Sequence, residues 1–293
     1  SNTESLPSAA VRQMHGTRLP ALYAETTQYL TESGSSPYVV EGTSFIKHTL
    51  NIAAGTKLYL LPGSTLIILT NRNLDCNGTI QSLGEPGNPV TITCKKDDGS
   101  EPGSIGFRPQ FYNTSPAWDP LTRTGSILQH TLVTNIYNYI SFHSCRMMVT
   151  NCKFGPATSA VASFLVEGPD GPVVTRSLLQ NLPLDVRGSH EGGTLSFARN
   201  RIRCPGYYAT MIFYYSLVAP PLGTGQVVQN SFDGTKCIDV IQQNNTGIQL
   251  GNNHWAGSAN NPPVPEVIYN SATTNIYFAP VLSVAPDPCG PTW

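Results

Sequence analysis

The segment Val149-Thr150-Asn151-Cys152-Lys153-Phe154 sets the register that decides the fold. It reads apolar, two other residues, a small polar residue, one other residue, apolar. Four later segments repeat it: Val174 to Leu179, Phe197 to Ile202, Val227 to Phe232 and Leu250 to Trp255. The small polar positions follow one another at intervals of 23 to 30 residues. A repeat of this length is typical of a solenoid, in which each repeat forms one coil.

Glycine-punctuated strands precede this repeat. Between residues 50 and 94, apolar residues alternate at strand period, and glycines divide the segment into runs too short for helices. Equivalent residues of stacked coils lie about 4.8 Å apart, so the small polar residues should form a column at one corner. Asparagine suits this position because it tolerates left-handed backbone angles and can hydrogen-bond between coils. We call the following set the corner column and expect it to be structural: Cys152, Ser177, Asn200, Asn230 and Asn253.

The pattern predicts an all-β chain, a right-handed parallel β-helix of about eight to nine coils over residues 37–258. Segment 97–124, rich in Pro and Gly, is expected to leave the solenoid as a lateral loop. Apolar residues at helical spacing between Leu19 and Leu30 predict a capping helix within residues 1–36. The Asn261-Pro-Pro-Val-Pro265 segment opens a closing cap over 259–293, which should fold across the last coil. Caps of this kind cover the open ends of a solenoid.

Composition limits the class of partner. The 293 residues carry 17 basic and 18 acidic side chains, a net charge of −1, so nothing steers the chain toward nucleic acid or an anionic membrane. No apolar run approaches the length of a membrane span. Ser1 to Ala10 lacks the order of a signal peptide, so an exported protein would be in its mature form here. The seven cysteines form no CxxC pair or Cys/His cluster, which argues against a structural metal site.

Other features favour an extracellular setting. Asn77, Asn113 and Asn244 begin N-x-S/T sequons, and lysines are few. We therefore predict a secreted or cell-surface glycoprotein with these three candidate acceptors. The odd number of cysteines leaves at least one thiol unpaired, and the others are expected in disulfides or in stacked ladders inside the core.

Two segments carry a family resemblance. LNIAAGTKLYLLPGSTLII at 50–68 and NGTIQSLGEPGNPVTIT at 77–93 resemble the opening of secreted β-helix proteins of the pectate-lyase-like superfamily. GNNHWAGS at 251–258 and IYFAPVL at 276–282 are similar to their closing motif and final strand. The resemblance covers roughly residues 37 to 283 and implies the fold. It leaves function open, because the scaffold serves lyases, glycosidases, adhesins and proteins without known activity.

A second register predicts a lateral face. Each coil carries a doublet whose first residue should point inward and whose second should point outward. The outward row would be His143, Glu167, Arg187 and Tyr214. Together with Trp118 from the lateral loop, these side chains are our candidates for ligand binding, because tyrosine and tryptophan beside polar groups can stack on sugars. Their alternative role is to cover the last coils or the loop.

Catalytic residues are harder to assign. The resemblance implies calcium held by clustered aspartates with an Arg or Lys base, but Asp185 and Asp239 lie two coils apart and form no clear ligand cluster. We therefore expect no cofactor, and calcium is kept as the alternative. The aspartate trio of family glycosidases is also missing, and no catalytic residue is carried over. From the residues themselves, the candidates are Asp185, Arg187, His190 and Glu167. The alternatives are a cross-strand ion pair between Glu167 and Arg187 and a solvated turn around His190.

These observations lead to a main functional hypothesis and two alternatives. The main one is an extracellular module that binds a polysaccharide or cell-surface component through its lateral face, without turnover. The first alternative is a polysaccharide lyase or glycoside hydrolase with a diverged active site. The second is a structural element of a surface layer, spike or fibre.

Overall fold

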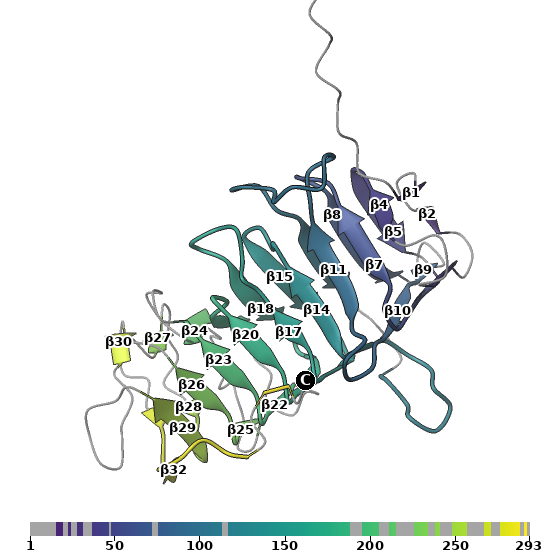
Figure 1. Ribbon diagram of the computed structural model, residues 1–293. Coiled ribbons are helices and arrows are strands. Elements are labelled where there is room, and N and C mark those ends of the chain that lie inside the picture. Colours follow the sequence, from purple (N-terminus) through teal and green to yellow (C-terminus); the bar gives the residue numbers. More distant parts are fainter. Residues whose placement is uncertain are drawn as a thin grey trace, which may run out of the picture.

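The computed structural model describes residues 16–19, 23–24, 28–31, 37–46, 48–71, 76–112, 117–187, 195–204, 211–214, 226–233, 238–240, 248–256, 267–270, 276–287 and 290–291. The chain is a right-handed parallel β-helix, and none of these residues is helical. Most coils contribute one short strand to each of three stacked sheets, which we call A, B and C. Figure 1 shows the coils stacked from the purple N-terminal end to the yellow C-terminal end.

Sheet A contains eleven of the described strands. They are β1 (Thr17–Leu19), β4 (Tyr38–Val40), β7 (Lys57–Leu60), β11 (Val90–Cys94), β14 (Thr131–Thr134), β17 (Lys153–Phe154), β20 (Leu178–Gln180), β23 (Arg201–Arg203), β26 (Ser231–Asp233), β29 (Asn253–Ala256) and β32 (Val281–Leu282). Sheet B follows sheet A in every coil. Its path runs through β2 (Tyr23–Ala24), β5 (Thr43–Ile46), β8 (Thr65–Asn71), β12 (Arg108–Tyr112), β15 (Tyr139–His143), β18 (Ser163–Glu167), β21 (Leu184–Arg187), β24 (Met211–Tyr214), β27 (Ile238–Val240) and β30 (Val267–Asn270).

Sheet C closes each coil. Its strands are β3 (Gln28–Leu30), β6 (Thr49–Ala53), β10 (Thr79–Leu83), β13 (Ile127–Gln129), β16 (Met148–Thr150), β19 (Val173–Thr175), β22 (Ser196–Ala198) and β25 (Val227–Val228). Two further strands, β28 (Ile248–Gln249) and β31 (Ile276–Tyr277), pair with each other in parallel. Strand β9 (Cys76–Asn77) pairs antiparallel with the end of β8 and lies off the three main paths.

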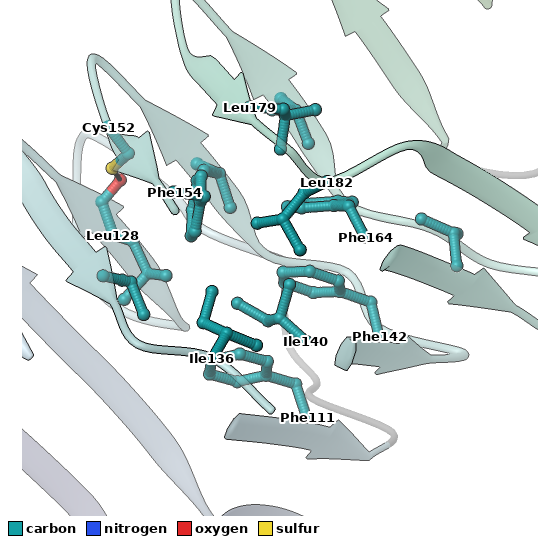
Figure 2. Packing of buried hydrophobic residues seen from close by; sticks show 14 of the residues in the cluster. Phe111, Leu128, Ile136, Ile140, Phe142, Cys152, Phe154, Phe164, Leu179 and Leu182 are labelled. Carbon is teal, nitrogen blue, oxygen red and sulfur yellow. Dashed lines mark hydrogen bonds between the residues drawn. The ribbon is translucent and has the colours of Figure 1, made fainter. Parts of the chain in front are cut away.

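The core is a stack of inward side chains from the three sheets. Strand alternation turns every second residue inward, and stacked coils bring like residues together. Phe111 and Phe142 stack with ring centroids 5.0 Å apart, and Phe142 and Phe164 follow at 4.6 Å. Figure 2 shows these rings packed among Ile136, Ile140 and Leu182. Burying each such ring stabilises the fold by about 1.5–3 kcal/mol.

The corner between sheets C and A holds the corner column in a single buried line. Each backbone N–H donates to the column side chain of the next coil: Cys152 to Ser177 Oγ at 3.2 Å, Ser177 to Asn200 Oδ1, Asn200 to Asn230 Oδ1, and Asn230 to Asn253 Oδ1, each of these at 2.9 Å. The residue just before each column position has positive φ, as at Asn151, Arg176, Arg199, Gln229 and Asn252. The column therefore joins the coils while the chain turns sharply in front of it.

The ends of the solenoid differ from the sequence prediction. The expected helix between Leu19 and Leu30 is not present in the described residues of that segment, which form parts of strands β1, β2 and β3 and pair in parallel with the next coil. Apolar residues separated by short turns give the same three-to-four-residue spacing as a helix. After residue 258, strands β30, β31 and β32 also pair in parallel with the preceding coil. Sheet A consequently has more strands than the eight to nine coils expected.

Strand β12 likewise lies within the segment expected to loop out, and it pairs with both β8 and β15. The prediction of disulfides finds no support in the described cysteines. Cys94, Cys152 and Cys204 are buried free thiols, and Cys145 is buried as well. No helix long and apolar enough to cross a membrane occurs in the part of the chain that the structure covers.

Candidate functional site: a polar strip on sheet B

The outer face of sheet B carries an aligned row of polar side chains. Parallel pairing places Tyr112 beside His143, His143 beside Glu167, and Glu167 beside Arg187. We call these four residues the outer strip. Tyr214 is next in the register, beside Arg187, but its side chain lies outside the described part. Three of the sequence-predicted ligand-binding residues therefore share one face, in successive coils.

Contacts run along one half of the strip. The rings of Tyr112 and His143 stack at 4.5 Å with an interplanar angle of 9°. His143 Nδ1 lies 3.2 Å from Glu167 Oε2. Burial lowers the pKa of His143, and Arg187 acts in the same direction, whereas Glu167 opposes the shift. Burial of the Tyr112 ring also raises the pKa of its phenol.

Arg187 is held by a buried carboxylate of its own strand. Its Nη2 lies 2.9 Å from Asp185 Oδ2, and its Nε donates to Asp185 Oδ1 at 3.3 Å. Ser163 Oγ, from the preceding coil, donates to Asp185 Oδ2 at 3.4 Å. The side chain of Asp185 is 3% exposed, against 40% for Arg187. The two-atom contact fixes the guanidinium on the surface, as a forked ion pair does.

The chemistry of Asp185 follows from this burial. Removal from water raises its pKa above the ordinary value, although Arg187 and Ser163 counter the shift. The sequence alternative that paired Glu167 with Arg187 is not what the structure shows, since Glu167 pairs with His143 and Arg187 with Asp185. A buried carboxylate has the greater need of a cation, because an unpaired buried charge is costly.

A second outward row lies beside the outer strip and includes Asp185. Strand pairing aligns Gln110, Ser141, Leu165 and Asp185. Gln110 accepts a hydrogen bond from Tyr112 Oη at 3.4 Å and donates to Tyr139 Oη at 3.3 Å. The hydroxyl of Ser141 is buried and has no partner among the described residues. Buried polar groups without partners are few in native proteins, and a bound water or a role in a site are among their explanations.

Trp118 lies elsewhere on the molecule. It lines a small cavity of ≈ 90 Å³ with Arg146, Met148 and Val173. Met148 and Val173 belong to sheet C, so Trp118 does not join the outer strip. Arg146 forms an ion pair with Asp170 at 2.9 Å. The structure thus divides the predicted ligand-binding set between two faces.

Several predicted residues lie outside the described part of the chain. His190, Asn113 and Asn244 are among them. Asn77 is described only through its backbone in β9. Of the catalytic candidates, Asp185, Arg187 and Glu167 therefore lie on one face, while the position of His190 relative to them stays open.

Sheet A carries a separate hollow of ≈ 380 Å³ on its outer face. Its walls include Tyr59, Thr93, Thr134 and Asn135. The hydroxyls of Thr93 and Thr134 lie 2.6 Å apart, and Asn135 Nδ2 donates to Thr93 Oγ1 and to Glu101 Oε2. These polar groups form hydrogen bonds mainly with one another, so the hollow offers few hydrogen-bonding groups for a ligand.

Sequence reasoning missed Tyr112, Gln110 and Ser163. The signal for Tyr112 was available, because Phe111-Tyr112 has the same inward–outward doublet as Phe142-His143. It was overlooked because the surrounding segment was expected to form a loop. Ser163 has no such signal, since a serine opening a strand is common. Its contact with Asp185 depends on the stacking of coils.

No group of three or more His, Cys, Asp or Glu side chains in the described residues could hold a metal ion. Comparison with known proteins adds no assignment. No family model, curated protein or solved structure matches this chain.

Proposed function

We propose that the protein is an extracellular binding module that recognises an acidic polysaccharide through the outer strip on sheet B, without turnover. The observation that carries this proposal is the fixed guanidinium of Arg187, which buried Asp185 holds at the surface in register with Glu167, His143 and Tyr112. The strip offers donors and acceptors in successive coils, about 4.8 Å apart.

The kind of contact follows from the geometry. Tyr112 and His143 cover one face of each other's rings, so the strip would bind a sugar chain mainly by hydrogen bonds from ring edges and charged groups. Arg187 suits a uronate carboxylate because guanidinium forks bind carboxylates with two parallel hydrogen bonds. Glu167 and the imidazole of His143 would accept or donate to sugar hydroxyls. The nearby buried hydroxyl of Ser141 adds a polar group without a partner among the described residues.

The proposal is tested by binding measurements with a panel of acidic and neutral polysaccharides. We expect the wild-type chain to bind at least one uronate-containing polymer in isothermal titration calorimetry. Arg187→Ala should weaken that affinity about tenfold or more, because it removes a charge-assisted contact. The proposal would be refuted if the wild-type chain bound none of the acidic polymers, or if Arg187→Ala bound them with full affinity.

Arg18→Ala is the matched control. Arg18 is 40% exposed, as is Arg187, and it also pairs with an aspartate, Asp97. It lies on β1 of sheet A, remote in sequence and sheet from the outer strip. We expect its loss to leave binding unchanged. Equal losses from both variants would point to a diffuse charge effect.

One observation favours a second candidate, a diverged polysaccharide lyase or glycosidase. Asp185 has a raised pKa and touches Arg187 beside Glu167, and raised carboxyl pKa values are common among general acids. Its 3% side-chain exposure argues against direct contact with a polymer. Assays for new reducing ends and unsaturated products separate the candidates: product formation that Asp185→Asn abolishes would replace the binding proposal.

A further inference from the structure

Four arginines gather on a different surface, at the corner between sheets C and A and on the adjoining outer face of sheet A. We call Arg176, Arg199, Arg201 and Arg203 the arginine surface. Thr175 pairs with Ala198 and Leu178 pairs with Arg201, which places Arg176 beside Arg199 in the next coil. Arg201 and Arg203 follow on β23. All four arginines are exposed.

Little negative charge from the described residues faces this group. Asp233 lies 3.2 Å from Arg201 and 3.4 Å from Arg203. Arg199 Nε donates to the neutral amide of Gln229 at 3.3 Å. No carboxylate of the described chain is within ion-pair distance of Arg176 or Arg199. Among the described residues, four cations face one anion, which makes a strongly positive patch on a chain whose net charge is −1.

The backbone gives a second, independent observation. Arg176 and Arg199 have φ of 49° and 58°, in the left-handed region. The equivalent corner position is Asn151 in the preceding coil, Gln229 in the following coil and Asn252 in the coil after that, with φ of 52°, 56° and 59°. Asparagine tolerates these angles better than arginine. Three successive coils, at Arg176, Arg199 and Gln229, therefore use a less suitable residue where asparagine fits, and two of the three are arginine. Strained positions are often retained for function.

We infer that the arginine surface is a second binding site, for a polysaccharide that carries tetrahedral oxyanion esters, sulfate or phosphate. Neighbouring coils set Arg176 and Arg199 about 4.8 Å apart, close enough for both guanidinium forks to engage one anionic group. A planar carboxylate offers two oxygens and is satisfied by one fork, whereas a sulfate or phosphate ester offers three. Arg201 and Arg203 extend the positive surface along the chain of the bound polymer.

A polysaccharide is the occupant that the surface favours over nucleic acid. Binding to single-stranded nucleic acid uses aromatic side chains interleaved with the basic ones, and none of the described residues between 173 and 182 or between 198 and 204 is aromatic. A site for duplex DNA would need a much broader positive field. Duplex DNA is included in the test as the competing ligand.

The test uses polymers built on one backbone: dextran, carboxymethyl dextran, dextran sulfate and dextran phosphate. Binding of the full chain to each is measured by calorimetry at low and at physiological salt. We expect dextran sulfate or dextran phosphate to bind more tightly than carboxymethyl dextran, neutral dextran not to bind, and added salt to weaken binding. The stronger of the two esters identifies the source. A carboxymethyl dextran that binds as tightly as both esters, or duplex DNA that binds more tightly, overturns the inference.

The double variant Arg176→Asn/Arg199→Asn separates binding from folding. Asparagine relieves the left-handed backbone, so the variant should unfold at the same temperature or about 2 °C higher. Its affinity for the preferred ester should fall about tenfold or more. Arg123→Asn is the matched control, since Arg123 is exposed and has φ of 54° in a different turn, and it should leave binding unchanged. Unchanged binding by the double variant refutes the site.

Arg187→Ala distinguishes this site from the outer strip on sheet B. It should keep full affinity for the ester-bearing dextran while it loses the acidic polymer of the proposed function. If Arg187→Ala loses both, one site binds all anionic glycans and the arginine surface is not a separate site. If only the double variant Arg176→Asn/Arg199→Asn loses binding, and Arg187→Ala keeps full affinity for both polymers, the second site stands and the proposed function fails.

Discussion

The two halves of the corner column hold their coils together by different means. In the C-terminal half, Asn200, Asn230 and Asn253 each accept from the backbone of the preceding coil through Oδ1. Each also donates through Nδ2 to the residue that opens the preceding register: Val174, Phe197 and Val227. One amide thus makes two bonds across a coil boundary.

The N-terminal half makes these contacts only in part. Cys152 Sγ reaches the carbonyl of Leu128 at 3.3 Å, the equivalent of the asparagine contact, but through a weak donor (Figure 2). Ser177 Oγ accepts from Cys152 N and then donates back to Thr175 of its own coil. A serine is too short to span both partners. Two-bond bridging between coils therefore depends on a carboxamide, and the halves should differ in stability.

Removal of one asparagine should have the largest effect. Asn230→Ala leaves the N–H of Asn200 and the carbonyl of Phe197 buried without this partner. We expect the free energy of unfolding to fall by about 2–4 kcal/mol, because each buried polar group left unpaired costs about 1–3 kcal/mol. Ser177→Ala removes one bond between coils and should cost about 1 kcal/mol. Urea unfolding followed by circular dichroism measures both, and equal losses would contradict the difference between the halves.

A fourth asparagine in the corner column should change the free energy of unfolding by a smaller amount and in the opposite direction. In Ser177→Asn, the new Oδ1 would take over the bond from Cys152 N, and Nδ2 would gain the carbonyl of Val149, which opens that register. We expect a gain of up to about 1 kcal/mol in unfolding free energy. Ser177→Asp, of the same shape but without the donor, is the control and should be less stable than wild type. A gain from both would show that size alone matters.

The column could be predicted from sequence because one position recurs with fixed neighbours. Even so, a sixth copy was missed: Leu128-Gln-His-Thr131-Leu-Val133 has the same register, and Thr131 precedes Cys152 in the stack. The segment from Leu19 to Leu30 was misassigned because its apolar spacing fits a helix as well as short strands. The spacing of apolar residues alone cannot distinguish a helix from short strands. Pairing with the next coil makes this segment strands.

At the candidate site, alignment was predictable and pairing was not. Doublet spacing placed His143, Glu167 and Arg187 on one face, as strand register does. The choice of Asp185 as the partner of Arg187 depends on how deeply Asp185 is buried, and burial arises from packing of whole coils. Trp118 was grouped with the strip because a loop residue carries no register, and the structure places it against sheet C.

The smallest effect concerns the thiol of Cys152. Burial raises its pKa to about 12, so in the folded chain it stays a neutral donor to Leu128 up to high pH. Its alkylation by iodoacetamide at pH 8 should proceed only in denaturant, because the thiolate is the nucleophile and the sulfur is buried. The unfolded thiol ionises near the ordinary cysteine pKa of 9.0. Between pH 9.0 and about 12, the folded chain therefore keeps a proton on Cys152 that the unfolded chain loses. The contribution of this protonated thiol to the free energy of unfolding is lost as the pH rises through that range. Mass spectrometry after labelling, with and without urea, measures how far the fold protects Cys152 from iodoacetamide. Rapid modification of native Cys152 at pH 8 would show that this half of the column opens readily, while Cys152→Ala should unfold with a weaker dependence on alkaline pH.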